Sequence, residues 1–297
     1  MATFTDALQA RALVCDGGLA TALEARGHNL AGGLWSARLL FDTPDEIAAV
    51  HRAFFAAGAD IAITASYQAS FRGFANCGIG RRGTERLLRR SVRIAVDVRD
   101  EFGRGFIAAS IGPYGAAAAD GSEYRGRYGL SVRELRAWHR PRFEILADTG
   151  ADVLAVETIP DLDEAEALAS LISEFRVPAW LSYTISGERT RAGQPLSDAF
   201  EVASEIDSIV AVGVNCCAPA DVIPAIDTAQ HAGKPVIVYP NSGEGWDAES
   251  GRWAGESEFS VQLARQWAAA GAQIIGGCCR VGAGDIAQVA SALSRPT

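Results

Sequence analysis

Two pairs of adjacent cysteines, Cys216-Cys217 and Cys278-Cys279, are the residues best suited to chemistry in this sequence. Each pair closes an apolar run typical of a buried strand, at residues 209–214 and 272–275. Neighbouring side chains on a continuing strand point to opposite faces, so both members of a pair can serve one site only where the strand ends. The glycines Gly276-Gly277 permit such an ending. One thiolate from the first pair and two from the second would match a catalytic zinc site with an open fourth position.

Adjacent cysteines can also be small buried hydrophobic residues. The position of both pairs at strand ends, with glycines and an asparagine beside them, favours metal binding over packing. Cys15 and Cys77 are interpreted as packing or chance thiols. The histidines have no metal-ligand spacing and are not assigned to the site; they are His28, His51, His139 and His231.

Length and composition limit the class of protein. The chain has 297 residues, of which 48% are hydrophobic, and an α/β barrel of roughly 250 residues would fit it as one domain. We find no signal peptide and no apolar run of the roughly 18 residues that a membrane span needs. Six cysteines in so long a chain do not form a disulfide framework, which favours a reducing cytoplasm. A net charge of -9 argues against nucleic acid and anionic membranes as partners.

A helix-to-strand junction recurs along the chain. The sequence Ala-Gly-Ala-Asp at residues 57–60 precedes the apolar run at 61–64. Related glycine junctions precede the runs that begin at residues 153, 236 and 274. A glycine suited to a helix C-cap followed by a buried strand is typical of parallel β/α architecture. The apolar runs predict eight strands, at residues 12–16, 61–64, 106–111, 153–157, 179–184, 210–215, 236–239 and 273–276. We therefore expect residues 1–297 to form a single (β/α)8 TIM barrel domain.

Polar residues follow the predicted strands. Asp16 with Gly17-Gly18 follows the first strand, Thr64 and Ser66 the second, and Glu157 the fourth. In a β/α barrel these ends converge on the face that carries active sites. Helix starts are predicted at Thr43-Pro44 and at two apparent capping boxes, Ser131 to Glu134 and Asp161 to Glu164. Two long loops on the site face, residues 115–129 and 241–255, are candidates for a substrate lid.

These stretches resemble the zinc-dependent homocysteine S-methyltransferases. The resemblance rests on Asp16-Gly17-Gly18-Leu19-Ala20-Thr21, on residues 63–68, on Gly213-Val214-Asn215-Cys216 and on Gly276-Gly277-Cys278-Cys279-Arg280. It extends to residues 112–115, 120–126 and 239–244, which are similar to the branch that uses S-methylmethionine or S-adenosylmethionine rather than betaine. The family implies a homocysteine-binding barrel, one zinc ion per chain and methyl transfer to homocysteine to give methionine.

The resemblance also implies roles for single residues. Cys216, Cys278 and Cys279 take the positions of the zinc ligands, which leaves Cys217 to packing. Asp16 and Glu157 would hold the ammonium group of homocysteine, Gly17 and Gly18 its carboxylate, and Thr64 would add a hydroxyl contact. Ser66 is a further hydroxyl candidate from its position alone. The donor pocket would draw on aromatic and polar residues of the same loops, since aromatic faces attract sulfonium cations; the candidates are Tyr67, Gln68, Tyr114, Tyr128, Asn241 and Trp246.

The expected chemistry is activation of a thiol. A free alkyl thiol with a pKa of about 8.5 is mostly protonated at neutral pH, and a coordinating thiol is deprotonated. A sulfonium donor leaves as a neutral thioether, so the reaction needs no general acid. The expected partners are therefore small molecules, homocysteine and a sulfonium donor, with no cobalamin and no nucleotide other than S-adenosylmethionine; a monomer is favoured. The chain has no room for the further modules of a cobalamin-dependent methionine synthase.

Other functions stay open at this stage. The zinc could activate water in a hydrolase or lyase, although three thiolates would make it a poorer Lewis acid. The acceptor could be another thiol or a selenol. A zinc-storage protein or redox sensor would need only the cysteines, so the presence of Asp16, Thr64 and Glu157 argues against it.

Overall fold

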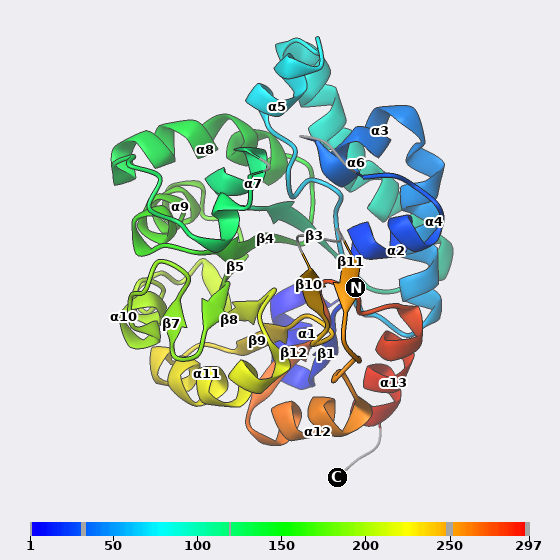
Figure 1. Ribbon diagram of the computed structural model, residues 1–297, viewed down its shortest axis with the longest axis vertical. Coiled ribbons are helices and arrows are strands. Elements are labelled where there is room, and N and C mark those ends of the chain that lie inside the picture. Colours follow the sequence, from blue (N-terminus) through cyan, green and yellow to red (C-terminus); the bar gives the residue numbers. More distant parts are fainter. Residues whose placement is uncertain (1, 31–33, 119, 248–251, 295–297) are drawn as a thin grey trace.

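Eight parallel strands form a ring at the centre of the molecule, surrounded by helices (Figure 1). The structure is a computed structural model that describes residues 2–30, 34–118, 120–247 and 252–294. The ring strands are β1 (Leu13–Val14), β2 (Ile61–Ile63), β3 (Phe106–Ile111), β4 (Val153–Ile159), β5 (Ala179–Tyr183), β8 (Ile209–Asn215), β9 (Val236–Tyr239) and β12 (Ala272–Ile275). All eight predicted strands are confirmed, and with them the TIM barrel.

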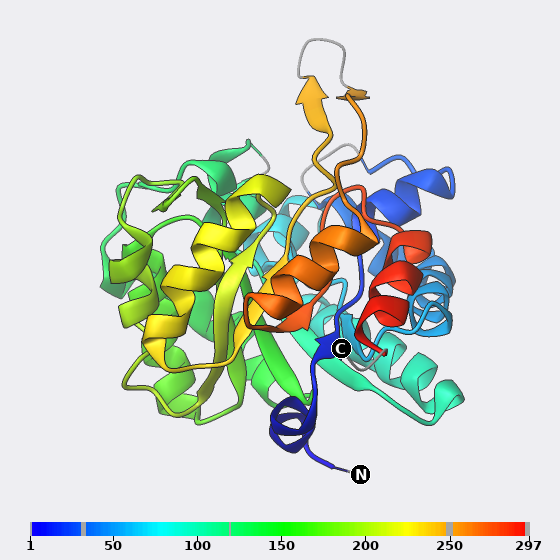
Figure 2. The ribbon, with the colours of Figure 1, turned by 90° about the horizontal axis from the view of Figure 1, so that it is seen from below.

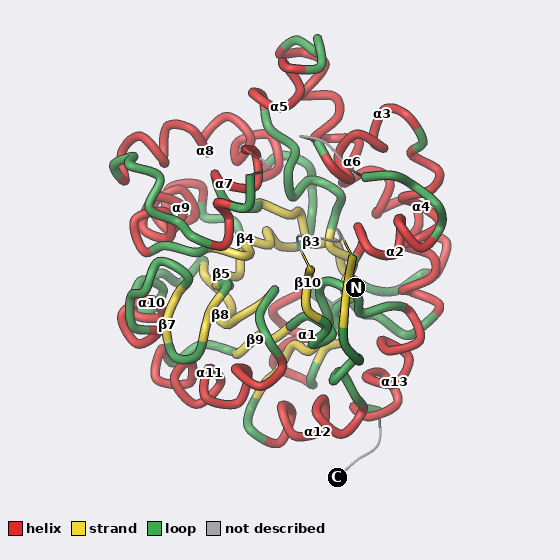
Figure 3. The backbone as a smooth tube through the Cα atoms, in the orientation of Figure 1, coloured by secondary structure: helices red, strands yellow, loops and turns green. Residues whose placement is uncertain are grey.

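The helices alternate with the strands and form the outer layer (Figure 3). All three predicted helix starts are confirmed: Pro44 is the first residue of α4, Ser131 and Glu134 form a reciprocal capping box on α8, and Asp161 is the N-cap of α9. The Asp161 capping box was wrong, because Asp161 accepts from Asp163 N and Glu164 turns inward to His139. The helices are α1 (Phe4–Ala10), α2 (Leu19–Ala25), α3 (Leu39–Asp42), α4 (Pro44–Ala56), α5 (Phe71–Asn76), α6 (Arg81–Phe102), α7 (Tyr114–Ala118), α8 (Val132–Ala147), α9 (Leu162–Phe175), α10 (Leu196–Glu201), α11 (Val222–Ala229), α12 (Val261–Ala269) and α13 (Ala283–Leu293).

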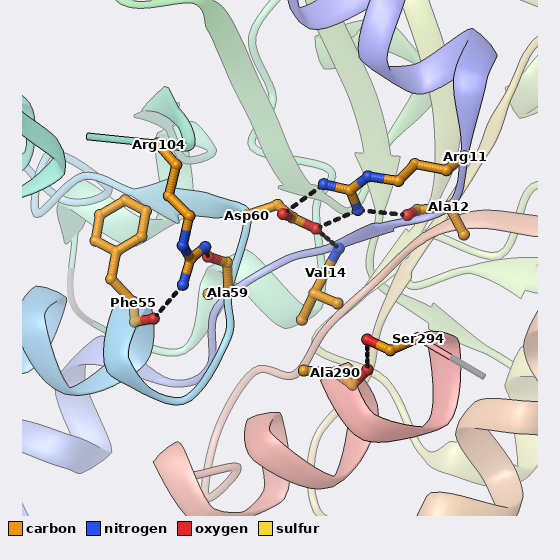
Figure 4. A network of polar contacts seen from close by, with 9 residues as sticks. All are labelled: Arg11, Ala12, Val14, Phe55, Ala59, Asp60, Arg104, Ala290 and Ser294. Carbon is orange, nitrogen blue, oxygen red and sulfur yellow. Dashed lines mark hydrogen bonds and ion pairs between the residues drawn. The ribbon is translucent and has the colours of Figure 1, made fainter. Parts of the chain in front are cut away.

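The ring closes through a narrow seam between β1 and β2. Seven neighbouring strand pairs have parallel ladders, whereas these two meet at a single bridge, Cys15 to Ile61. The Asp60 carboxylate strengthens the seam by accepting from Val14 N at 3.0 Å and from both terminal nitrogens of Arg11 (Figure 4). Beside it, Arg104 donates to the carbonyls of Phe55 and Ala59 at the end of α4. Side-chain hydrogen bonds thus replace part of a missing ladder.

One end of the barrel interior is closed by α1, which lies opposite the hairpin of β10 (Gly245–Asp247) and β11 (Arg252–Ala254) (Figure 2). Phe4 and Trp180 belong to the cluster of buried apolar side chains inside the ring, and the partly buried Phe106 packs against Phe4. A second, larger cluster lies between the ring and the helices. Apolar side chains therefore fill this end, whereas the cavity described below lies at the carboxyl ends of the strands.

Two short hairpins were not predicted. The first joins β6 (Ile185–Ser186) to β7 (Arg189–Thr190), and the second joins β10 (Gly245–Asp247) to β11 (Arg252–Ala254) within the predicted lid loop 241–255. The second hairpin rises from the open end of the barrel (Figure 2). None of the helices in the described ranges is long and apolar enough to cross a membrane.

Candidate metal centre

Three cysteine sulfurs converge at the open end of the barrel. The Sγ atoms of Cys216, Cys278 and Cys279 all lie within 4.8 Å of one another, and those of Cys216 and Cys279 are 3.9 Å apart. Tetrahedral zinc with Zn–S bonds of about 2.3 Å places its sulfurs ~3.8 Å apart. The spacing of the three sulfurs therefore suits a single metal ion.

The backbone of the two strand ends creates this convergence. Cys216 adopts a left-handed conformation with φ of 50°, immediately after β8. Strand β12 ends at Ile275, and the following loop is held by hydrogen bonds from Cys278 N to Pro240 O and from Cys279 N to Asn241 Oδ1. The strand thus ends before the second pair, as the sequence required for both of its cysteines to face one site.

The charge balance of the cluster favours a cation. Hydrogen bonds from the neighbouring thiols lower the pKa of Cys216 well below its ordinary value, while the same contacts raise the pKa of Cys278 well above it. One thiolate forms readily among the three, and further ionisation is opposed by the charge already present. A divalent metal would remove that conflict, so the donor set fits a zinc ion held by three thiolates.

The other cysteines do not join the cluster. Cys217 is buried in the layer between ring and helices, and Cys15 is buried inside the ring. Cys77 is exposed at the end of α5. Their positions agree with the packing or chance roles expected of them.

The sulfurs form part of the wall of a cavity that contains most of the predicted site. Six further segments contribute to the wall: the α2 start, β2, β4, β9, the 3-10 helix Trp35–Arg38 and the 3-10 helix Ser122–Tyr124. Seven of the ten predicted site residues line the cavity: Gly17, Gly18, Thr64, Glu157, Cys216, Cys278 and Cys279. Residues from six strand ends therefore meet in one place, as expected for a β/α barrel.

Glu157 is the carboxylate of the cavity wall. Its Oε1 accepts a hydrogen bond from Ser110 Oγ, and its side chain is 6% exposed. Burial raises the pKa of Glu157 to about 7, partly offset by the hydrogen bond from Ser110. A buried carboxylate without a cationic partner is costly, so this group is well placed to receive a positively charged substrate group.

Asp16 and Ser66 lie behind the wall and are not among the described residues that line the cavity. Asp16 Oδ2 accepts from Ile63 N at 2.8 Å, and burial, with the nearby charge of Glu157 adding to it, raises the pKa of Asp16 well above its ordinary value. Ser66 Oγ bonds to Thr64 Oγ1 at 2.8 Å and donates to Ser110 O. These contacts orient Thr64 and the β2 end.

The glycine pair allows the first loop to approach the cysteine loop. A Cβ on Gly17 would lie 2.3 Å from Val281 O, and one on Gly18 would lie 2.4 Å from Cys278 O. Gly18 N already donates to Val281 O at 3.0 Å. Close packing against the second cysteine pair is therefore a structural reason for both glycines, beside any role in binding an anion.

Two further residues of the cavity wall, Tyr124 and Thr158, were not predicted as site residues. Tyr124 Oη lies 3.2 Å from Cys216 Sγ, and its position in the predicted lid loop 115–129 was the available signal. Thr158 adopts φ of 61°, which is strained for a β-branched residue. The Asn215 side chain holds it by accepting from Thr158 N and donating to Thr158 Oγ1, both at 2.7 Å. This turn ends the regular part of β4 directly after Glu157.

The donor-pocket candidates separate into two groups. Tyr67 lines the cavity, whereas Tyr114 and Tyr128 pack against each other outside its described lining, with ring centroids 5.0 Å apart. Gln68 is buried away from that lining, and Asn241 reaches the cysteine loop through its bond to Cys279 N. The side chain of Trp246 lies outside the described part of the chain.

Comparison with known proteins gives the family. A family model described as homocysteine S-methyltransferase matches residues 13–293. The chain belongs to the homocysteine S-methyltransferase family. It is 46% identical to homocysteine S-methyltransferase YbgG of Bacillus subtilis, with 94% of this chain and 93% of that protein covered. Identity to the homocysteine S-methyltransferase of Escherichia coli is also 46%, with 93% of each chain covered. The crystal structure of the metallated form of the homocysteine methyltransferase MmuM from Escherichia coli superposes with a TM-score of 0.86 at 42% identity, covering 95% of this chain and 96% of that one.

Proposed function

We propose that this barrel, residues 1–297, transfers a methyl group from a sulfonium donor to the sulfur of homocysteine and thereby forms methionine. The observation that carries the proposal is the convergence of three cysteine sulfurs with Glu157 in the wall of one cavity. Homocysteine has a thiol that suits a metal held by the cysteine sulfurs and an ammonium group that suits the Glu157 carboxylate. Family membership and the names of the relatives support the same reaction.

Cys216, Cys278 and Cys279 would hold one zinc ion per chain. Zinc in that position supplies a place where the acceptor sulfur stays deprotonated at neutral pH, since a coordinating thiol loses its proton. The hydrogen-bonding contact between Tyr124 Oη and Cys216 Sγ and the bond from Cys279 N to Asn241 hold two of the three ligands in place. Such supporting contacts help to fix the orientation of metal ligands.

The remaining polar groups would orient the amino-acid part of homocysteine. The Glu157 carboxylate would pair with the ammonium group, and Asp16 would support this part of the wall from behind through the bond that it accepts from Ile63 N. Gly17 and Gly18 place backbone close to the cavity for the carboxylate, and Thr64 offers a hydroxyl whose direction is set by Ser66. Asn241 would act indirectly, by holding the loop of Cys278 and Cys279 through the bond that it accepts from Cys279 N.

The transfer itself needs no proton donor from the protein. The homocysteine thiolate forms a bond to the methyl carbon as the bond from that carbon to the sulfonium sulfur breaks. The electron pair of the broken bond stays on the donor sulfur, which leaves as a neutral thioether. The protein would act by alignment of the two sulfurs with the methyl carbon between them. Tyr67 and Tyr124 line the cavity and offer aromatic faces to the cationic donor.

The donor is proposed to be S-methylmethionine or S-adenosylmethionine, on the resemblance of residues 112–115, 120–126 and 239–244 to that branch. Three cysteines that bind metal need a reducing compartment, which supports a cytoplasmic location. We propose a monomer that acts on small molecules, without cobalamin, nucleic acid or a membrane surface.

The test is methionine formation from homocysteine by reduced, zinc-loaded protein. S-methylmethionine, S-adenosylmethionine and betaine are offered in parallel. Turnover with either of the first two and none with betaine supports both the reaction and the branch. Stoichiometric zinc without methionine from any of the three donors would overturn the proposal, and thiols or selenols other than homocysteine would then be offered as acceptors.

A further inference from the structure

A second cavity lies on the outside of the barrel, away from the cysteines. It is formed by α5, the start of α6 and the middle of α8, which are neighbouring elements on one side of the ring (Figure 1). Its lining includes three arginines, Arg72, Arg81 and Arg142, and no acidic residue among the described residues that form it. The charge of this cavity is therefore opposite in sign to the net charge of -9 of the whole chain.

The buried arginine of this cavity has unused hydrogen-bonding capacity. Arg142 is 2% exposed, and its Nη2 bonds to Gly112 O and to His139 Nδ1. Its Nε and Nη1 are buried without a hydrogen-bond partner in the described structure. Two unpaired donors on a buried guanidinium are costly, and an anion in the cavity would supply acceptors for them.

Glu164 is a buried carboxyl group close enough to interact with the charge of Arg142, but no hydrogen bond joins the two in the described structure. Glu164 Oε1 is occupied by His139 Nε2 at 2.8 Å and by Tyr114 N. Burial raises the pKa of Glu164 to about 8, and the bond from Tyr114 N and the charge of Arg142 partly offset that rise. Arg142 makes no ion pair with a described residue, and its guanidinium lies 4.7 Å from the ring centroid of Trp138.

The rest of the lining adds positive potential from two sources, the side chains of Arg72 and Arg81 and the start of helix α6. Arg72 makes no ion pair with any described residue, and Arg81 stacks on Phe71 while pairing with Glu85 in its own helix. Helix α6 has 22 residues, begins at Arg81 after an N-cap glycine without a side-chain cap, and has no acidic residue in its first turn. Arginine at a helix start is opposed by the helix dipole, and a bound anion would offset that repulsion.

We propose that this cavity binds a small phosphate-bearing molecule. A phosphate dianion offers enough oxygens for three guanidinium groups and the free N–H groups of a helix start, more than a carboxylate does. Phe71, Ile79, Trp138 and Pro141 give the cavity an apolar wall against which an organic group attached to the phosphate would pack. The group that the cavity would recognise is the phosphate, whether it is free or part of a nucleotide.

The site is structurally connected to the reaction cavity. Arg142 holds the Gly112 carbonyl, and a Cβ on Gly112 would lie 2.6 Å from the ring of Tyr67, which lines the reaction cavity. The binding test nevertheless does not depend on turnover, so it can fail independently of the proposed reaction.

The experiment is calorimetric titration of the zinc-loaded full chain with inorganic phosphate and, separately, with adenosine 5′-monophosphate. We expect saturable binding of one equivalent, and the tighter probe distinguishes free phosphate from a nucleotide. The double variant Arg72→Ala/Arg81→Ala, which changes only exposed side chains, should weaken binding about tenfold or more through loss of charge-assisted hydrogen bonds. Arg142→Gln, with its fold checked by circular dichroism, should weaken binding as well.

Two controls separate this site from other causes. Arg90→Ala removes an exposed arginine from the same helix outside the cavity and should leave the affinity unchanged. Cys278→Ser removes a proposed metal ligand and should also keep phosphate binding. No saturable binding of either probe at millimolar concentration overturns the proposal. It is equally overturned if the double variant binds as tightly as the original chain, or if Arg90→Ala weakens binding to the same extent.

Discussion

The two ends of the barrel interior differ although the same strands build both. Near α1 the inward side chains are apolar, as at Leu13, Val153 and Trp180. Toward the open end they become polar, and Ser110, Glu157 and Asn215 are all buried there. The change follows the strands: on β4, alternate residues at 153, 155 and 157 run from valine through alanine to the cavity glutamate.

This difference separates stability from chemistry within one ring. The apolar end buries Phe4 against Phe106 and Trp180, where each side chain contributes hydrophobic free energy. The polar end requires a network, because every buried polar group must find a partner. Tyr239 lies at the boundary: its hydroxyl accepts from Trp180 Nε1 at 2.9 Å and bonds to Ser182 Oγ at 2.7 Å.

If the polar end performs the chemistry, Cys278→Ser should have the largest effect on turnover. We expect loss of bound zinc and a fall in activity on the order of a thousandfold or more, since removal of a direct ligand exceeds the cost of losing a supporting contact. Metal content by mass spectrometry and methionine formation are measured together. Cys217→Ala is the matched control, because Cys217 lies in the core next to a ligand and should keep zinc. A fully active, zinc-replete Cys278→Ser protein would remove this residue from the metal centre.

Glu157→Ala should affect the acceptor rather than the metal. Loss of the carboxylate leaves the homocysteine ammonium group without its buried partner, and we expect acceptor affinity to fall about a hundredfold with zinc retained. The KM for homocysteine and the zinc content are the two measurements. Unchanged KM would mean that the ammonium group binds elsewhere.

The pH profile should show a smaller effect from the same residue. Because the pKa of Glu157 is raised to about 7, its carboxylate is protonated below that pH and cannot pair with a cation. The kcat/KM for homocysteine should therefore rise about tenfold per pH unit up to about 7 and then level off. Glu157→Gln should lose this limb of the profile, and an identical limb in the variant would assign it to another group.

The same raised pKa has a consequence for stability. The folded protein holds a proton on Glu157 that the unfolded chain releases near the ordinary pKa of 4.5. The contribution of this group to the free energy of unfolding is thus fully present below about 4.5 and decreases as the pH rises through about 7.

At the apolar end, Phe4→Ala should leave turnover unchanged. Phe4 is 3% exposed and fills the ring interior, so its truncation should lower the free energy of unfolding by about 3 kcal/mol. Denaturant unfolding measures the loss, and zinc content and kcat below the unfolding transition should match those of the original chain. A drop in kcat in the folded protein would contradict the separation of the two ends.

The barrel could be predicted from the sequence because glycine junctions and apolar runs are local signals. The cysteine cluster was also predictable, since both pairs stand at strand ends. Period-two alternation from Trp180 also points to Ser182 as an inward residue, a signal that was not used. The contact of Tyr124 with Cys216 depends on how a long loop folds back over the barrel, which no local pattern specifies. The left-handed turn at Thr158 is stabilised by Asn215 on another strand and could not be read from its own neighbours.

The seam between β1 and β2 gives the ring an unequal resistance to opening. One bridge and the Asp60 contacts take the place of a ladder here, so this is where the ring should open most easily. Amide hydrogens at the seam should therefore exchange with solvent sooner than those between β4 and β5. Asp16 and the Gly17-Gly18 turn come shortly after β1. A transient opening of the seam would therefore shift the part of the cavity wall that they form and support. Cys216 immediately follows β8, which pairs along its length with β5 and β9, and it should keep its place when the seam opens.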